Sequence, residues 1–253
     1  MLVDFKNTLN INKKAYANET CEIKAINTEN IKYIDEAAFY KANIKSLKNL
    51  PELCKIGKEA FSFSQIKNFD FKNVQTIERN AFANTCLKDA NMPKLETIEK
   101  CAFLNSVITS FTAPHLAKVP HAVFMSCKKL KHIEIPNCKK IGSYAFTNCI
   151  NLKKITLPKT LEKLDDGVFC RCKKLEEVTF LSDIVVPYSI FEDCQSLKKI
   201  YVSENFIKLN KYFTELYKDK IVTNSLDMIL TQAKSFKEIN DICKKYNSEM
   251  KDR

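Results

Sequence analysis

One short motif recurs along most of the chain, and its period limits the folds that are available. The motif is an aliphatic residue, four other residues and an aromatic residue, as in Ile141–Phe146. A unit of roughly 22 residues cannot bury its apolar face alone, so successive units must stack as a solenoid. The aromatic positions are Tyr16, Phe39, Phe61, Phe82, Phe103, Phe124, Phe146, Phe169 and Phe191.

Each unit also carries an apolar set at positions 1, 4 and 6 of a second motif, as in Leu152, Ile155 and Leu157. The alternation over positions 4 to 6 is typical of a strand. A proline such as Pro158 follows in four units, and it ends the strand because proline donates no backbone hydrogen bond. We therefore expect one short strand, a turn and a return segment with a buried aromatic residue in each unit. The first unit places Ile23, Ile26 and Thr28 at these three positions.

The string from Ile141 to Pro158 resembles a BspA-type leucine-rich repeat, and the resemblance extends over roughly residues 11–213. It implies an α/β fold, a right-handed leucine-rich repeat solenoid. A parallel concave sheet of about nine short strands would face short helical turns on the convex side. The resemblance also implies a non-enzymatic module for protein–protein or cell-surface, adhesion-type interactions.

The ends and the early units depart from the regular pattern. We expect a capping rung over residues 1–20, repeats over 21–213 and a helical cap over 214–253, because terminal rungs would otherwise expose their core. Helical spacing predicts an amphipathic helix over 225–247, with partner binding as its alternative role. In the later units, a cysteine lies three residues before the first leucine of the strand motif. The early units are one residue shorter at this place, so we expect a less regular sheet over residues 20–115. The residues compared are Cys127, Cys149, Cys172 and Cys194 against Phe63, Asn84 and Asn105.

The composition argues against catalysis and against a metal or cofactor site. Three Gly and three His among 253 residues leave little material for phosphate loops or general bases. The pair Cys170 and Cys172 has no second pair or His at zinc spacing, so we expect no metal. The repeated cysteines are expected to be small buried side chains whose thiols bond to turn backbone. Disulfides between rungs are the alternative interpretation.

Lysine dominates position 2 of the strand motif, and this column explains part of the +11 net charge. One lysine per rung would line the lip of the concave sheet, where it could bind a polyanion. The alternative is that the lysines serve solubility and protect the sheet edge. The residues of this lysine ladder are Lys24, Lys45, Lys67, Lys88, Lys131, Lys153 and Lys198.

Positions 3 and 5 of the strands should form the concave recognition face. Their mixed polar character suits a protein partner better than a small molecule. We assign partner binding on this face to Asp70, Asn91, Thr112, His132, Glu134, Lys154, Thr156, Thr179, Lys199 and Tyr201.

The partner and the location are constrained only broadly. A protein partner is favoured, with an acidic glycan or an anionic membrane surface as alternatives, and an intracellular scaffold without polyanion binding is the second hypothesis. Nucleic acid is disfavoured because exposed aromatic residues for base stacking are few. The start of the chain lacks signal-peptide features and no stretch is apolar enough to span a bilayer. We therefore expect a cytoplasmic protein with reduced thiols, or one that reaches the cell surface by a non-classical route.

Overall fold

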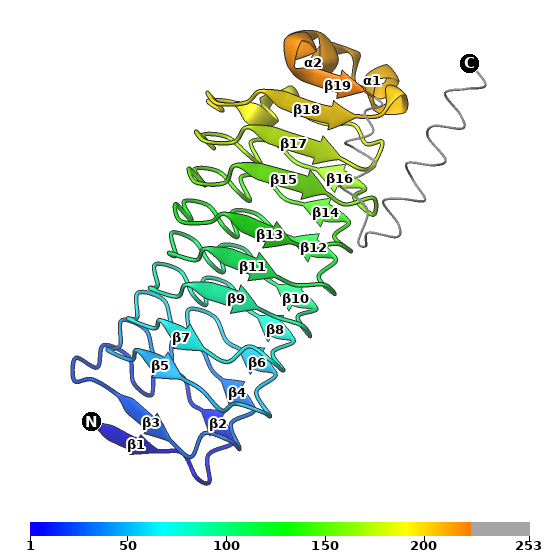
Figure 1. Ribbon diagram of the computed structural model, residues 1–253. Helices are drawn as coiled ribbons and strands as arrows, with labels where there is room; N and C mark the ends of the chain where they lie inside the picture. Colours follow the sequence, from blue (N-terminus) through cyan, green and yellow to red (C-terminus); the bar gives the residue numbers. More distant parts are fainter. Residues whose placement is uncertain (224–253) are drawn as a thin grey trace, which may run out of the picture.

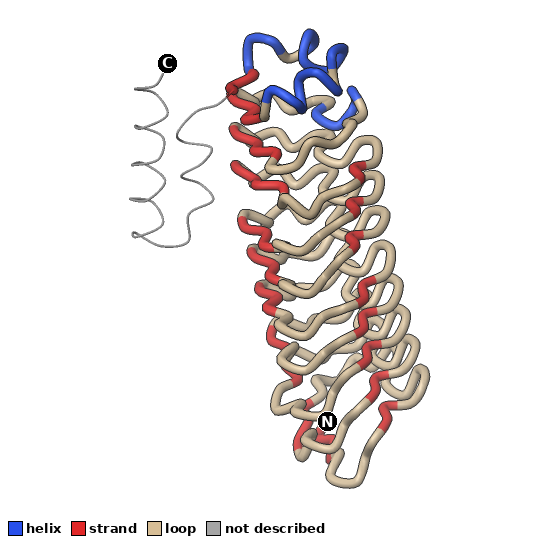
Figure 2. Tube along the Cα trace, turned by 90° about the vertical axis from the view of Figure 1, so that its right-hand side faces the viewer, coloured by secondary structure: helices blue, strands red, loops and turns tan. Residues whose placement is uncertain are grey.

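The structure is a computed structural model that describes residues 1–223, and it is an elongated stack of coils (Figure 1). Two columns of parallel strands run along the stack as separate tracks (Figure 2). We call them the first and the second strand column. The first consists of β1 (Leu2–Asp4), β3 (Lys24–Ile26), β5 (Ser46–Leu47), β7 (Asn68–Phe69), β9 (Asp89–Asn91), β11 (Ser110–Thr112), β13 (His132–Glu134), β15 (Lys154–Leu157), β17 (Glu177–Phe180), β18 (Lys199–Val202) and β19 (Ile221–Thr223).

The second strand column was not predicted. Its strands are only two residues long and coincide with the start of the aromatic motif, in the segment that we expected to be a simple return. The outer residue of each strand is exposed or half-buried, and the aliphatic residue is buried. The strands are β2 (Asn10–Ile11), β4 (Tyr33–Ile34), β6 (Lys55–Ile56), β8 (Thr76–Ile77), β10 (Thr97–Ile98), β12 (Lys118–Val119), β14 (Lys140–Ile141) and β16 (Lys163–Leu164).

The core between the two columns contains a continuous stack of the motif aromatics. Neighbouring rings from Tyr16 to Phe191 lie 5.1 to 5.8 Å apart between centroids, with interplanar angles of 3 to 21°. Parallel strands are spaced about 4.8 Å apart, so one offset-stacked ring per coil matches the rise of the solenoid. The predicted burial of the aromatic residues is confirmed for Phe39 to Phe191, whereas Tyr16 in the first coil is half-buried.

The turn around each motif aromatic from Tyr16 to Phe169 depends on left-handed backbone at two places, two residues before the ring and two after it. At Phe146 these residues are Tyr144 and Asn148, with φ of 59° and 61°. Left-handed backbone favours glycine, yet Gly167 is the only glycine among the described residues with positive φ. Tyr144 N–H donates to the carbonyl oxygen of Asp166 on the next coil. The scarcity of glycine therefore reflects left-handed turns that other residue types form with the help of hydrogen bonds between coils.

Two prolines divide the second strand column. In regular coils the residue after the motif aliphatic donates its N–H to the preceding coil, as Gly142 does to Val119 and Asp165 to Ile141. Pro120 and Pro187 occupy this position and have no N–H to donate. The ladder from β2 to β10 accordingly ends before β12, and the ladder from β12 ends at β16.

The first strand column is less regular over residues 20–115, as predicted. Its strands there have two or three residues, against four in β15, β17 and β18, and ladders break between β3 and β5 and between β7 and β9. A further break between β13 and β15 was not predicted. The predicted inward position of Ile26 was wrong, because β3 pairs with β1 in a register that exposes Ile26 and turns Ala25 inward.

Short helices occur at the C-terminal end of the described stack, one before β18 and three after it. Their bounds are η1 (Tyr188–Phe191), α1 (Glu204–Leu209), α2 (Lys211–Leu216) and η2 (Lys218–Lys220). The hydroxyl of Ser203 accepts the N–H of Phe206 at 3.0 Å and begins α1, and Phe206 and Phe213 are buried in the common core. The repeats before Tyr188 contain turns in place of the helical segments predicted for the convex side. The predicted helix over 225–247 lies outside the described residues, and the right-handed coil and concave curvature stay predictions.

Candidate recognition surface

The lysine ladder is exposed along its whole length. All seven lysines lie in or directly before first-column strands and have exposed side chains. Backbone hydrogen bonds join neighbouring rungs of the ladder, for example from Lys67 N–H to the carbonyl oxygen of Lys45. Thr109 takes the same place between Lys88 and Lys131, and it bonds to both through the backbone. Hydrogen bonds thus join the ladder in three groups, which match the separate sheets of the first strand column: Lys45 with Lys67, Lys88 with Lys131 through Thr109, and Lys153 with Lys198 through Glu176.

Ion pairs divide the ladder into two classes of lysine. Lys45 Nζ lies 3.1 Å from a carboxylate oxygen of Glu22, and Lys198 Nζ lies 3.4 Å from one of Glu176. The hydrogen bond from Lys45 is the main cause that lowers the pKa of Glu22. Among the described residues, no ion pair involves the other five lysines, Lys24, Lys67, Lys88, Lys131 and Lys153.

The middle of the predicted recognition face is a set of residues in register. His132 and Glu134 lie on β13 opposite Ser110 and Thr112 of β11. The next strand, β9, continues these two rows with Asp89 and Asn91. The hydroxyls of Thr109 and Ser110 donate to one oxygen of Asp89 at 2.7 and 2.9 Å. His132, Glu134 and Asn91 are exposed and Thr112 is half-buried, so this part of the face is open to a partner.

The C-terminal part of the face combines a charged row with an aromatic ring. Lys154, Glu177 and Lys199 lie in register on β15, β17 and β18. Lys154 Nζ lies 2.8 Å from Glu177, and this hydrogen bond is the main cause that raises the pKa of Lys154. Lys199 Nζ lies 6.0 Å from the ring centroid of Tyr201. The three charged side chains alternate in sign along this row, beside the half-buried ring of Tyr201.

Two residues assigned to the face are not free to contact a partner, one because it is buried and the other because it bonds to the backbone. Thr179 is only 6% exposed although its neighbours Thr156 and Tyr201 are in register with it, so its assignment to partner binding was wrong. Asp70 is half-buried, and its carboxylate accepts the backbone N–H of Lys72 at 3.1 Å and that of Leu50 at 3.5 Å. Asp70 therefore stabilises the turn after β7.

A second lysine column was missed. Lys118, Lys140 and Lys163 lie in register on β12, β14 and β16, and all three are exposed. Lys163 Nζ lies 2.9 Å from Asp165, whereas no ion pair of Lys118 or Lys140 occurs among residues 1–223. The signal in the sequence is a lysine directly before the motif aliphatic residue. It predicts a row of lysines only when that segment is recognised as a strand of a parallel ladder.

The repeated cysteines are buried or half-buried, and their thiols donate to backbone, as predicted. Cys172 Sγ lies 3.1 Å from the carbonyl oxygen of Phe146, and Cys194 Sγ lies 3.0 Å from that of Phe169. Burial raises the pKa of Cys194 to about 12 and also raises that of Cys172. Cys170 Sγ instead points toward Glu192 at 3.9 Å, so it diverges from Cys172. High thiol pKa values keep these side chains protonated and unreactive.

Within the described part of the chain, no group of three His, Cys, Asp or Glu side chains is arranged to hold a metal ion. His121 packs against Tyr144 edge to face, at 5.8 Å between ring centroids. Residues 1–223 also include no helix with the length and apolar character that a membrane span requires.

The comparisons with known proteins point to one family. The sequence model of the BspA type leucine rich repeat region matches residues 9–131 and 117–243. No curated protein sequence matches the chain. The pneumococcal vaccine antigen PcpA is a similar solved structure, with 18% identity, a TM-score of 0.48 and coverage of 88% of this chain and 77% of PcpA. A leucine-rich repeat protein from Bacteroides ovatus has 16% identity, a TM-score of 0.45 and coverage of 89% of this chain and 84% of its own.

Proposed function

Because the chain belongs to the BspA-type leucine-rich repeat family, we propose that it is a binding module without catalytic activity. Its partner is a protein, which binds across the exposed polar residues of the first strand column. The observation that supports this surface is the register of β9, β11 and β13, which aligns polar side chains of three coils in two rows. Extended surfaces of this kind are the usual binding sites of solenoid proteins.

The charge of the ladder favours a partner with an acidic surface. Lys67, Lys88, Lys131 and Lys153 lack ion pairs among the described residues, and their charges are free to attract an anion. Lysines on either side of Thr109 are about 10 Å apart at two strand spacings. Long-range attraction between such a surface and an acidic partner speeds association and weakens as salt increases.

Three anionic probes test this proposal on the full chain. Poly-L-glutamate represents an acidic protein, heparin a sulfated glycan, and phosphatidylserine vesicles an anionic membrane. We expect poly-L-glutamate to bind with an affinity that falls as salt rises from low to physiological concentration. The double variant Lys131→Glu and Lys153→Glu should lose roughly tenfold or more in affinity, at about 1 kcal/mol for each lysine near an anionic surface.

A variant with the same change in net charge provides the control. Lys118→Glu and Lys140→Glu alter the second strand column and leave the ladder intact. Equal losses for the two double variants would mean that net charge alone drives binding, and the ladder assignment would fail. Binding that is insensitive to salt would favour the second candidate, an intracellular scaffold without polyanion affinity. A stronger response to heparin or vesicles than to poly-L-glutamate would replace the acidic protein as partner.

A further inference from the structure

The outer edge of β16 is unpaired in the described structure. In the regular coil before it, the carbonyl oxygen of Lys139 accepts the N–H groups of Glu162 and Lys163 at 2.8 and 3.1 Å. The carbonyl oxygen of Ile141 accepts the N–H of Asp165 at 3.0 Å. One coil later, the carbonyl oxygens of Glu162 and Leu164 face the same way. No hydrogen bond from residues 1–223 reaches either oxygen.

Two residues explain why the next coil does not pair with this edge. Pro187 stands where Asp165 stood one coil earlier, and it has no N–H to offer Leu164. The N–H of Val186, whose position does not donate to the preceding coil in regular coils, bonds to the side-chain oxygen of Asn210 at 2.9 Å. Asn210 also donates its side-chain amide to the carbonyl oxygen of Ile184 at 2.8 Å. The segment 183–187 is thereby held toward the helices, and the ladder of the second strand column ends at β16.

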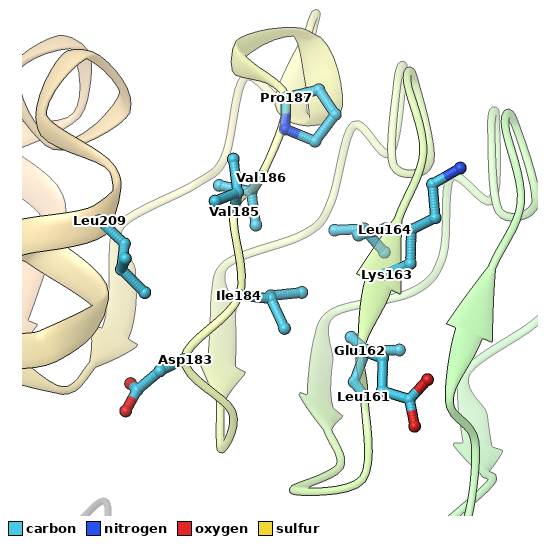
Figure 3. A pocket seen from close by; sticks show the side chains of 10 residues that line it. All are labelled: Leu161, Glu162, Lys163, Leu164, Asp183, Ile184, Val185, Val186, Pro187 and Leu209. Carbon is cyan, nitrogen blue, oxygen red and sulfur yellow. The ribbon is translucent and has the colours of Figure 1, made fainter.

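A groove of about 890 Å³ opens between β16 and the segment 183–187. Figure 3 shows the side chains that line it from both sides. Leu161, Leu164 and Ile184 form buried parts of its wall. Val185 and Leu209 are apolar but 69% and 53% exposed at its margin. Apolar surface exposed beside unpaired backbone marks a site of interaction.

We propose that this groove binds an extended peptide segment of a partner protein, which adds to β16 as a parallel strand. The unpaired backbone requires a strand, because only a strand offers N–H groups at the spacing of the Glu162 and Leu164 oxygens. The wall selects apolar side chains at alternate positions of that strand. The peptide would extend the ladder of β12, β14 and β16 by one strand. Its register on β16 should therefore be the register that β16 has on β14.

The chain itself supplies the probe for this site. The peptide with the sequence of residues 159–167 contains the strand that pairs with β14 in the protein. Because the edge of β16 repeats that of β14, a labelled, end-capped form of this peptide should bind the full-length protein saturably in a fluorescence anisotropy titration. Methylating the peptide nitrogen that corresponds to Asp165 removes one N–H and keeps every side chain. This change should weaken binding by roughly tenfold, the usual effect of one lost hydrogen bond.

A variant of the protein tests the location. Val185→Asp places a charge at the exposed margin of the groove and should abolish peptide binding. Val107→Asp, at another exposed valine, is the matched control and should bind normally. Thermal unfolding of both variants checks that the fold is retained. If Val185→Asp does not fold, the smaller change Val185→Thr with the same titration takes its place.

Amide hydrogen exchange of Leu164 gives an independent readout. The N–H of Leu164 should exchange fast in the free full-length protein and slow down on saturation with the peptide. Absence of peptide binding, equal binding of the methylated peptide, or equal binding by Val185→Asp would overturn the proposal. Slow exchange at Leu164 without peptide would also overturn it, because another part of the chain would then already pair with β16. None of these outcomes bears on the lysine ladder, which lies along the first strand column.

Discussion

Cys149 donates its thiol to the backbone carbonyl oxygen of Phe124 on the preceding coil, at an Sγ–O distance of 3.2 Å. The same contact joins Cys127 to Phe103, Cys172 to Phe146 and Cys194 to Phe169. Each thiol adds a second hydrogen bond to a carbonyl oxygen that already accepts the backbone N–H three residues later, as Phe124 does from Cys127. The repeated cysteine is therefore a hydrogen-bonding link between coils.

Replacing the cysteine should destabilise the fold more when the hydrogen-bond donor is removed than when it is kept. Cys149→Ala removes the thiol and leaves the carbonyl oxygen of Phe124 with one hydrogen bond, from the N–H of Cys127. The free energy of unfolding should therefore fall by about 0.5–1.5 kcal/mol, the usual net value of one hydrogen bond. Cys149→Ser keeps a donor and should lose less. Urea unfolding of the two variants and the wild type measures the difference. A serine variant as unstable as the alanine variant would contradict the hydrogen-bonding role.

Alkaline pH should weaken the fold through the same column of thiols. Burial raises the pKa of Cys127 from 9.0 to about 12. Between these values the folded protein holds a proton that the unfolded chain releases, so stability that is complete below pH 9 is lost as the pH rises toward 12. The wild type should therefore lose stability relative to Cys127→Ser, by about 1.4 kcal/mol per pH unit above 9. Unfolding of both proteins in urea from pH 8 to pH 11 tests this, and a constant difference would refute it.

The stacked rings should dominate the stability of the middle coils. Phe146 lies between Phe124 and Phe169, at centroid distances of 5.3 and 5.6 Å, and is fully buried. Phe146→Ala should reduce the free energy of unfolding by about 3–5 kcal/mol, since it removes packing on both neighbours. Tyr144→Ala, two residues away and 44% exposed, is the control and should have a much smaller effect. Comparable losses in the two variants would mean that the stack contributes little.

The sequence-based prediction succeeded for features that recur in every unit. It failed for the two-residue strands and for single residues that end a ladder. The period of the two motifs predicted the solenoid, the first strand column and the burial of one aromatic ring in each unit, because each repeated unit has the same apolar face to bury. The second strand column was missed because two-residue strands contain no alternation. The effect of Pro187 depends on Asn210, which is 23 residues later and bonds to its neighbours Ile184 and Val186. No spacing rule could have connected them.

The sequence analysis aligned the early units with the cysteine position of the late units one residue too early. We expected Phe63, Asn84 and Asn105 at the cysteine position, yet these residues have φ of 60°, 57° and 53° and form the left-handed turn. The buried small residues that follow them, Ser64, Thr85 and Ser106, occupy the place of the cysteines. Ser106 Oγ lies 3.4 Å from Cys127 Sγ, which confirms the equivalence. The missing residue of the early units therefore lies after this position, where Lys128 and Lys129 replace Val107.

This correction yields a prediction for Ser64. Its hydroxyl is buried and has no hydrogen-bond partner among the described residues, unlike that of Thr85, which donates to the carbonyl oxygen of Phe82 at 2.8 Å. A buried hydroxyl without a partner costs about 1–3 kcal/mol, so Ser64→Ala should raise the free energy of unfolding by up to about that amount. Ser106→Ala is the matched control, and it should lower stability because it removes the contact with Cys127. Thermal and urea unfolding of both variants would decide the matter, and a loss of stability in Ser64→Ala would mean that its hydroxyl has a partner in solution.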